Sequence, residues 1–297
     1  MTDGDNTGGT SPERSGRALV PGLYFVATPI GAARDITLRG LDILRTADVL
    51  AAEDTRTLRH LMEIHGIPVN GRPLIPYHDH NGDAARPRVL NALAQGRSVA
   101  YASEAGTPLV ADPGFQLGRA AIAEGYGVFA APGASAVLAA LTVAGLPTDR
   151  FLFAGFPPNT RAARRKWVRD FAAVPATLVF YESPKRVGEM LTDLSQELGG
   201  DRRAAVCREL TKRFEEVKRG TLDELAAVFG GQSVKGEIVV LVDRGQGVVH
   251  GAEEVEAMLR QRLSHMSVKD AAAKVAEALN MPRREIYQKA LDLENDE

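Results

Sequence analysis

The residues best suited to chemistry lie in a long loop of small residues, 103–114, with the sequence SEAGTPLVADPG. An apolar run, residues 98–102, precedes this loop, and a helical pattern begins near Phe115. In an open α/β sheet, ligands bind beyond the carboxyl ends of the strands, where small residues let backbone N–H and C=O groups approach them closely. We therefore predict that this loop holds a small molecule through its main chain.

Two further loops have the same low bulk, at residues 28–31 and 132–136. Taken singly, each loop is better explained as a tight turn of an α/β fold. The chain has no Gly-x-Gly-x-x-Gly after its first apolar run and no Walker phosphate loop, which argues against an ordinary dinucleotide site or a kinase. The order and spacing of the three loops favour one ligand site.

Charged side chains that could take up a proton or hold a phosphate follow the apolar run at residues 49–52. They are Glu53, Asp54 and Arg56. The alternative is structural, because Asp54 or Thr55 could cap the helix that follows. The two roles can coexist.

The segment YHDHN, residues 77–81, supplies a second polar group, in which His78 is a candidate for proton transfer. His78, Asp79 and His80 together suggest a metal site. With no cysteine nearby and no matching histidine pair downstream, an exposed polar loop is the better interpretation, and we expect no metal. Glu182, in the segment FYES, is a further polar candidate.

Two groups of basic residues could contact nucleic acid. The first is a run on a predicted helix, in which Arg161, Arg165 and Arg169 share one face. A solvated helix face is the ordinary explanation of such a run. The second group lies near the C-terminus and comprises Lys269, Lys274, Arg283, Arg284 and Lys289.

Apolar runs alternate with helical patterns over the first half of the chain, which predicts a parallel sheet joined by right-handed crossovers. The expected strands are residues 23–27, 49–52, 98–102 and 128–131, and the expected helices are residues 38–47, 89–94, 117–122 and 134–144.

The rhythm breaks at residues 145–150, where we place a domain boundary. Beyond it we expect a second α/β domain of mixed pairing, with strands at 177–181, 204–207 and 238–242 and helices at 185–198 and 222–229. Three short helices, 255–263, 268–279 and 284–293, suggest a helix-turn-helix appendage. The predicted divisions are a disordered tail (1–20), an N-terminal α/β domain (21–148), a second α/β domain (149–243), a linker (244–251) and a helical appendage (252–297).

Composition is that of an ordinary globular protein, with 297 residues, 44% hydrophobic and 25% charged. The net charge of −2 does not by itself indicate nucleic-acid binding. Cys207 is the single cysteine, and no apolar run reaches the roughly 18 residues of a membrane span. Residues 1–16 lack the apolar segment of a signal peptide, so we expect a cytoplasmic protein.

The whole chain resembles the tetrapyrrole methylase superfamily and, within it, the ribosomal RNA 2′-O-methyltransferases that modify a decoding-centre cytidine. The resemblance rests on the segments LYFVATPIGAARDITLRGLDILRTADVLAAEDTR, YHDHN, SEAGTPLVADPGF, PGASAVLAALTVAGLPTDRF, GFPP, FYESPKR, RELTKRFEE, GEIVVLV and SVKDAAAKVAEALNMPRREIYQKAL. AEDTR, FYES and ELTK point to the RNA-directed branch. Three positions depart from the usual family residue: Ala32, Glu104 and Lys185 stand where Asn, Asp and His are common.

This resemblance implies two α/β domains with S-adenosylmethionine in the cleft between them, and a homodimer. It also implies 2′-O-methylation of cytidine 1402 in the 16S rRNA of the small ribosomal subunit. The cofactor-binding residues that it implies are Pro29, Gly31, Ser103, Gly106, Thr107, Pro108, Ala134, Ser135, Tyr181, Glu237 and Ile238.

Methyl transfer to a ribose hydroxyl needs alignment of oxygen, carbon and sulfur, and a group that accepts the hydroxyl proton. We expect Asp54 or His78 to accept or relay that proton, with Glu53 a further catalytic candidate. RNA contacts are expected from Arg56, Arg161, Arg165, Arg186, Lys269 and Arg283.

Two other functions remain open. One is a tetrapyrrole methyltransferase acting on a corrinoid or porphyrinoid ring, and the basic groups favour RNA over it. The other is a non-catalytic nucleic-acid-binding protein that uses the C-terminal helices, which leaves the ligand-type loops unexplained.

Overall fold

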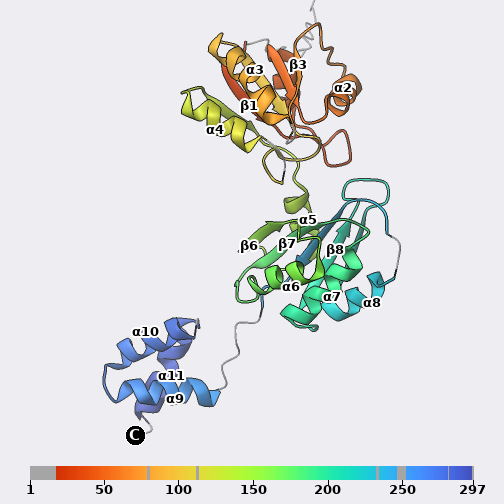
Figure 1. Cartoon of the computed structure of the whole chain (residues 1–297). Helices are drawn as coiled ribbons and strands as arrows, with labels where there is room; N and C mark the ends of the chain where they lie inside the picture. The colour runs from red at the N-terminus through yellow and green to blue at the C-terminus, as the bar shows by residue number, and fades with distance from the viewer. Residues whose placement is uncertain are drawn as a thin grey trace, which may run out of the picture. The chain divides into compact units, whose positions relative to one another are not determined.

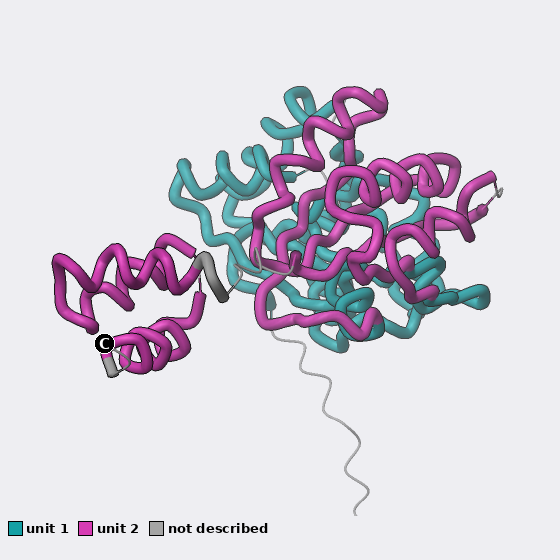
Figure 2. Tube along the Cα trace, turned by 90° about the horizontal axis from the view of Figure 1, so that it is seen from below, with its two compact units in different colours: residues 1–143, 207–217 teal, residues 144–206, 218–297 magenta. Residues whose placement is uncertain are grey.

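The computed structural model describes residues 18–78, 81–111, 114–231, 234–245, 252–279 and 281–295. The chain divides into two compact units, coloured separately in Figure 2. The first comprises Met1–Val143 with Cys207–Val217, and the second comprises Ala144–Val206 with Lys218–Glu297. Most of the predicted tail (1–20) and of the predicted linker (244–251) lies outside the described residues.

Five parallel strands form the sheet of the first unit, in the order β3-β2-β4-β1-β5 (Figure 1). β2 (Val49–Ala52), β4 (Ser98–Ala102) and β5 (Val128–Ala131) cover the predicted residues. The other two strands are β1 (Gly22–Val26) and β3 (Leu74–Pro76). The helices are α1 (Leu38–Thr46), α2 (Thr55–Ile64), α3 (Gly82–Ala94), α4 (Phe115–Ala123) and α5 (Ala136–Ala144).

Both faces of this sheet are covered, which is why its strands are continuous apolar runs. Leu44 of α1 and Met62 of α2 pack in a cluster with Val26 and Leu50. Helices α3 and α4 contribute to a separate cluster on the other set of strand residues, which includes Tyr101. The predicted parallel α/β architecture is confirmed.

The second sheet has the order β6-β7-β10-β8-β9. β6 (Phe151–Gly155) is parallel to β7 (Thr177–Glu182), whereas β10 (Ile238–Val242) is antiparallel to β7, so the pairing is mixed as predicted. The remaining elements are β8 (Arg203–Arg208), β9 (Glu216–Thr221), α6 (Arg161–Arg169), α7 (Val187–Leu198) and α8 (Leu222–Phe229).

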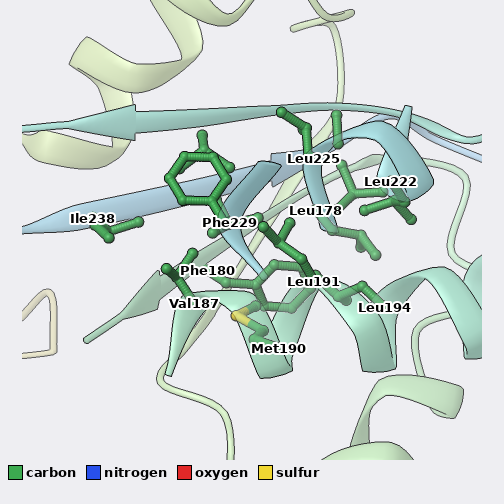
Figure 3. Close-up of a cluster of buried hydrophobic side chains, with 14 of the residues drawn as sticks. Leu178, Phe180, Val187, Met190, Leu191, Leu194, Leu222, Leu225, Phe229 and Ile238 are labelled. Carbon is green, nitrogen blue, oxygen red and sulfur yellow. The ribbon is translucent and has the colours of Figure 1, made fainter. Parts of the chain in front are cut away.

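Helices α7 and α8 supply much of the apolar core against this sheet (Figure 3). Met190 and Leu191 of α7 meet Phe180 of β7, and Leu225 and Phe229 of α8 join the same cluster. α8 begins with a capping box, in which Thr221 and Glu224 exchange side-chain to backbone hydrogen bonds.

The C-terminal helices have a core of their own. α9 (Ala252–Leu263), α10 (Val268–Ala278) and α11 (Arg283–Asn295) enclose buried Leu259, Val275 and Ile286. Ser267 caps α10 by accepting a hydrogen bond from the backbone N–H of Asp270. None of the helices in the described part of the chain is long and apolar enough to cross a membrane.

The structure has three strands that the sequence-based expectation lacked. Strands β3, β6 and β9 were not predicted, and each lies at an end of its sheet order. Residues 207–217, which lie within the expected domain 149–243, group with the first unit. In this hairpin, the hydroxyl of Thr211 accepts a hydrogen bond from the backbone N–H of Ala32.

Candidate functional site

The carboxyl ends of the five parallel strands bring the predicted loops of the first unit to one edge of its sheet. β1 and β4 are neighbours, but the crossover from β1 runs to β2 on one side, whereas that from β4 runs to β5 on the other. Such a reversal is the place where ligands bind in open α/β sheets.

Backbone hydrogen bonds join the loop after β1 to the loop after β4. Thr28 and Gly106 exchange two of them, at 2.9 and 3.0 Å. The Thr28 hydroxyl donates to the carbonyl of Ser103 at 3.2 Å, and the Ser103 hydroxyl donates to that of Gly106 at 3.0 Å. Pro29 and Gly31 follow directly, so these predicted residues lie together.

The loop after β5 joins the same group. The Thr107 hydroxyl donates to the carbonyl of Ala134 at 2.9 Å, and Ser135 then leads into α5. Gly106 has φ +82°, and a Cβ there would lie 3.3 Å from Ile30 Cγ2. The positive φ favours glycine here, and a Cβ would make a tight contact with the Ile30 side chain.

The loop 103–111 also holds strained backbone. Leu109 and Ala111 adopt φ values of 71° and 60°, which residues with a Cβ rarely do. Strain of this kind persists where the surrounding structure enforces it, and it gathers at ligand sites. Pro108 is buried beside it. Asp112 and Pro113 of the predicted loop lie outside the described residues.

The hairpin loop 209–215, between β8 and β9, is a part of this region that the site prediction omitted. The backbone N–H of Ala32 donates to Thr211 Oγ1 at 3.1 Å. A Cβ on Gly31 would lie 2.5 Å from Lys212 Cγ, so only glycine allows the approach. The positive φ angles of Glu209 and Thr211 follow from the fold. The segment RELTKRFEE stood out in the sequence, but nothing in it indicated this contact.

Asp54 caps α2, as one of the two predicted roles requires. Its Oδ1 accepts from the backbone N–H of Arg56 at 2.7 Å, and its Oδ2 lies 2.7 Å from Arg56 Nη2. The side-chain hydrogen bond from Arg56 is the main cause that lowers the pKa of Asp54 to about 2. A carboxylate with so low a pKa is a weak base at neutral pH. The Arg56 side chain is 90% exposed.

Glu53 and His78 lie at the ends of neighbouring strands. Glu53 Oε2 accepts from the backbone N–H of Glu104 at 3.3 Å. The backbone N–H of Tyr77 donates to the carbonyl of Ala52 at 2.8 Å, which places His78 beside the end of β2. The backbone N–H of His78 donates to Asn81 Oδ1 at 2.8 Å. Asp79 and His80 lie outside the described residues.

In the second unit, the antiparallel pairing of β7 and β10 brings Tyr181 and Glu182 opposite Val239 and Ile238. Glu237 precedes Ile238 in the chain, so the three residues predicted to bind the cofactor from this unit lie close together. Tyr181 packs edge-on against Phe153 and Phe156, with ring centroids 4.7 and 5.5 Å apart.

Glu182 is the most buried acid of this region, with its side chain fully covered. Its Oε1 accepts from the backbone N–H of Ser183 and lies 2.6 Å from Arg186 Nη2. Arg186 also donates to Asn159 Oδ1. Arg186, a predicted RNA contact, is thus fixed by two side chains and only partly exposed.

The basic run on α6 does not stand free in solvent. Arg161, Arg165 and Arg169 do share a face, but that face meets carboxylates of α7. Arg161 Nε lies 3.1 Å from Asp193 Oδ1, and both Arg165 and Arg169 pair with Glu197. These ion pairs explain why the three arginines are spaced four residues apart, without any RNA contact. From the sequence, only RNA binding or a solvated helix face was expected, and the ion pairs were not predicted.

The second predicted basic group is arranged differently. Lys269, Arg283, Arg284 and Tyr287 line a hollow of about 450 Å³ on the C-terminal helices. All four residues are exposed, and none of the three cations takes part in an ion pair within the described part of the chain. Lys269 stands in the first turn of α10, and Arg283 begins α11. Cations and an aromatic ring around a hollow suit a phosphate and a base.

Among the described residues, no group of three or more His, Cys, Asp or Glu side chains is placed to hold a metal ion.

Comparison with known proteins gives two family matches. Residues 22–226 match the model of tetrapyrrole (corrin/porphyrin) methylases, and residues 249–294 match the model described as the RsmI C-terminal HTH domain. A protein of Mesorhizobium japonicum named ribosomal RNA small subunit methyltransferase I is 45% identical over 94% of both chains. A Xylella fastidiosa protein of the same name is 43% identical over 89% of this chain and 97% of its own.

Solved structures support the fold. A cobalt precorrin-4 methyltransferase covers 74% of this chain and 94% of its own at 18% identity, with a TM-score of 0.57. A uroporphyrin-III C-methyltransferase of Thermus thermophilus, complexed with S-adenyl homocysteine, covers 74% of this chain and 96% of its own at 20% identity, with a TM-score of 0.51. At these identities the likeness concerns the fold alone.

Proposed function

This chain belongs to the tetrapyrrole methylase family, in the group of ribosomal RNA small subunit methyltransferases I, and we propose that it methylates small-subunit ribosomal RNA with S-adenosylmethionine. In finer detail, we propose the ribose 2′-hydroxyl of cytidine 1402 in 16S rRNA as the acceptor. The observation that carries the proposal is 45% identity to a protein of that name over 94% of the chain.

S-adenosylmethionine, when bound, supplies an activated methyl group, and the loops of the first unit suit such a ligand. They are built of small residues joined main chain to main chain, and Gly106 has a positive φ that favours glycine. We assign Pro29, Gly31, Ser103, Gly106, Thr107, Pro108, Ala134 and Ser135 to cofactor binding in this unit. The start of α5, just after Ser135, offers backbone N–H groups that suit a carboxylate.

In the second unit we assign Tyr181, Glu237 and Ile238 to the cofactor, because the β7–β10 pairing groups them and Tyr181 offers an aromatic surface. Ala32 stands where Asn is common in the family, but its contact with the hairpin does not depend on the side chain. The backbone N–H of Ala32 donates a hydrogen bond to Thr211 Oγ1.

For the proton of the ribose hydroxyl, we favour His78 over Asp54 as acceptor. The low pKa of Asp54, its bidentate pairing with Arg56 and its cap of α2 suit a structural role at the start of that helix. Glu53 is retained as a candidate. General-base help of this kind contributes about 10² to 10⁴-fold. His78→Gln should therefore lower the methylation rate far more than Asp54→Asn, and equal losses would contradict the assignment.

For RNA contact, the structure favours Arg56, Lys269 and Arg283, whose charged groups are exposed. Arg161, Arg165 and Arg186 remain weaker proposals, because each pairs with a buried carboxylate, whereas the carboxylate of Asp54 that pairs with Arg56 is partly exposed. We also propose a cytoplasmic homodimer, as the family resemblance implies, and sedimentation of the purified protein tests the dimer.

The decisive experiment is incubation with labelled S-adenosylmethionine and small ribosomal subunits from cells that lack the modification, followed by nuclease mapping and mass spectrometry. One cytidine labelled on its ribose in the decoding region is the expected result. Clear cofactor binding with no label in the RNA would overturn the proposal in favour of tetrapyrrole methylation. Absence of cofactor binding would exclude both enzymes.

A further inference from the structure

Hydrogen bonds and an ion pair within the hairpin loop 209–215 hold its backbone. The backbone N–H of Thr211 donates to Glu215 Oε2 at 2.6 Å, and that of Lys212 donates to the carbonyl of Glu209 at 3.0 Å. Lys212 Nζ also lies 3.1 Å from Glu209 Oε1. Leu210 is buried as an anchor. Glu209 and Thr211 both have positive φ, a conformation that residues with a Cβ keep only where the surrounding structure enforces it.

This fixed loop presents an aromatic ring to solvent. Phe214 is 63% exposed, although a phenylalanine is among the side chains that gain most from burial. The guanidinium carbon of Arg213 lies over the ring, 5.4 Å from its centroid. A cation over an aromatic face at this distance is a favourable cation–π contact. Phe214 and Arg213 together form what we call the hairpin platform.

The charged residues near the hairpin platform are paired with one another, whereas Arg213 is exposed. Glu209 pairs with Lys212, and Glu216 pairs with Arg208 at 3.2 Å. Glu215 accepts from the backbone of Thr211. Arg213 makes no ion pair within the described part of the chain. A cation beside an exposed ring complements a flat base attached to a phosphate, because aromatic rings and guanidinium planes both stack on unpaired bases.

The hairpin platform also lies near the candidate cofactor loop. Thr211, three residues before Phe214, holds the backbone of Ala32, and Lys212 packs against Gly31. Both loops belong to the first unit. A nucleotide held at this platform is therefore held by an element whose position is tied to that of the cofactor loop.

We propose that the hairpin platform, Phe214 with Arg213, stacks an unpaired base of the RNA substrate, while Arg213 neutralises a neighbouring phosphate. This inference rests on the proposed function, because it assigns to the hairpin platform the binding of single-stranded RNA by this enzyme. A second copy of this chain is the competing occupant, and its chemistry would require only an apolar side chain at position 214.

Three substitutions at one position separate these occupants. Phe214→Tyr keeps a flat ring, Phe214→Leu keeps apolar volume without one, and Phe214→Ala removes both. For stacking, binding to unmodified small ribosomal subunits should weaken about tenfold to hundredfold in the Leu and Ala variants and stay near wild type in Tyr. Ile122→Ala, at an equally exposed apolar residue of α4, is the matched control and should change nothing.

Two further readouts complete the test. Cofactor affinity, measured by calorimetry with S-adenosylmethionine alone, should be the same in all variants. Arg213→Gln should reduce the slope of log Kd against log salt by about one. Unchanged subunit binding in Phe214→Ala, or binding retained by Phe214→Leu with a changed sedimentation coefficient in Phe214→Ala, would overturn the inference. If wild-type protein neither binds nor methylates the subunits, the proposed function itself has failed, and this inference falls with it.

Discussion

Two basic regions of this protein look alike in the sequence and differ in the structure. On α6, Arg164 is fully buried against Asp193, and its exposed neighbours pair with Asp193 and Glu197 of α7. On the C-terminal helices, Lys269 and Arg283 line an open hollow, and none of the described residues in its lining is acidic. A run of arginines is thus available to a polyanion only where the fold places no carboxylates against it.

The difference assigns separate tasks to the two regions. Charges that are neutralised within the protein stabilise the packing of α6 on α7, whereas unpaired cations around a hollow lose little when they meet phosphate. Substitutions in the first region should therefore change stability more than RNA affinity, and substitutions in the second should do the reverse.

The largest effect is expected from Arg164→Met. It leaves the buried carboxylate of Asp193 without its 2.7 Å partner, and breaking a buried pair costs about 3–5 kcal/mol of unfolding free energy. Urea unfolding measures the loss. Lys269→Met, at an exposed position, should stay within about 0.5 kcal/mol of wild type. If Arg164→Met were equally harmless, the ion pairs on α6 would have no structural task. Adding Asp193→Leu should recover much of the stability, because it removes a buried carboxylate that only the exposed Arg161 still pairs with.

A change of the opposite kind is expected from Lys269→Ala, Arg283→Ala and Arg284→Ala combined. Loss of three phosphate contacts should lower the slope of log Kd against log salt by about two for single-stranded RNA. Filter binding of small ribosomal subunits over a salt series measures it, with urea unfolding as the check that stability is unchanged. The matched variant is Arg161→Gln with Arg165→Gln, which should lose stability and keep the slope. A fall in its slope at unchanged stability would restore the first basic run as an RNA site.

The same contrast shows what sequence could and could not reveal. Asp193 and Glu197 are four residues apart in the predicted helix 185–198, the spacing that matches Arg161 and Arg165. That signal was present, but it becomes meaningful only once α6 and α7 are known to pack side by side. Charge runs are therefore poor guides to function until the facing element is identified.

The fold was predictable where burial is complete. Strands β2 and β10 are continuous apolar runs and were placed to the residue, because the side chains on both faces of a covered strand are apolar. β3, β6 and β9 were missed, and all three are edge strands. β9 reads EVKRGT, whose strand form comes from pairing with a neighbour and not from its own apolar pattern.

The candidate site also has a part that could be predicted from the sequence and a part that could not. The loops after β1, β4 and β5 could be grouped from sequence, because parallel strands end at one edge. The contact of Thr211 with Ala32 could not, because residues so far apart in sequence are joined only by the tertiary fold.

A smaller effect is expected on the pH dependence of stability. A hydrogen bond from Arg165 is the main cause that holds the pKa of Glu197 below its usual range. A lowered folded-state pKa gives stability that is complete above the unfolded pKa, about 4.3, and that is lost as the pH falls through the folded value. Wild-type protein should therefore lose more stability than Glu197→Gln between about pH 5 and pH 3. Urea midpoints at each pH provide the measurement. The triple C-terminal variant should follow wild type, and if it matched Glu197→Gln instead, the two regions would not be electrostatically distinct.

The smallest effect is expected where a cation is paired but exposed, as Arg56 is with Asp54. Asn caps helices about as well as Asp, so Asp54→Asn should keep α2 intact and leave the unfolding midpoint nearly unchanged. It frees Arg56, whose side chain is 90% exposed, from a surface ion pair that contributes little. RNA affinity should then stay within about threefold of wild type, because an exposed pair opens at small cost when a phosphate arrives. Competition binding with unmodified small subunits measures the change. A large loss of affinity would show that Asp54 must hold Arg56 in one orientation. Exposure alone would then no longer distinguish the cations that bind RNA from those that stabilise the fold.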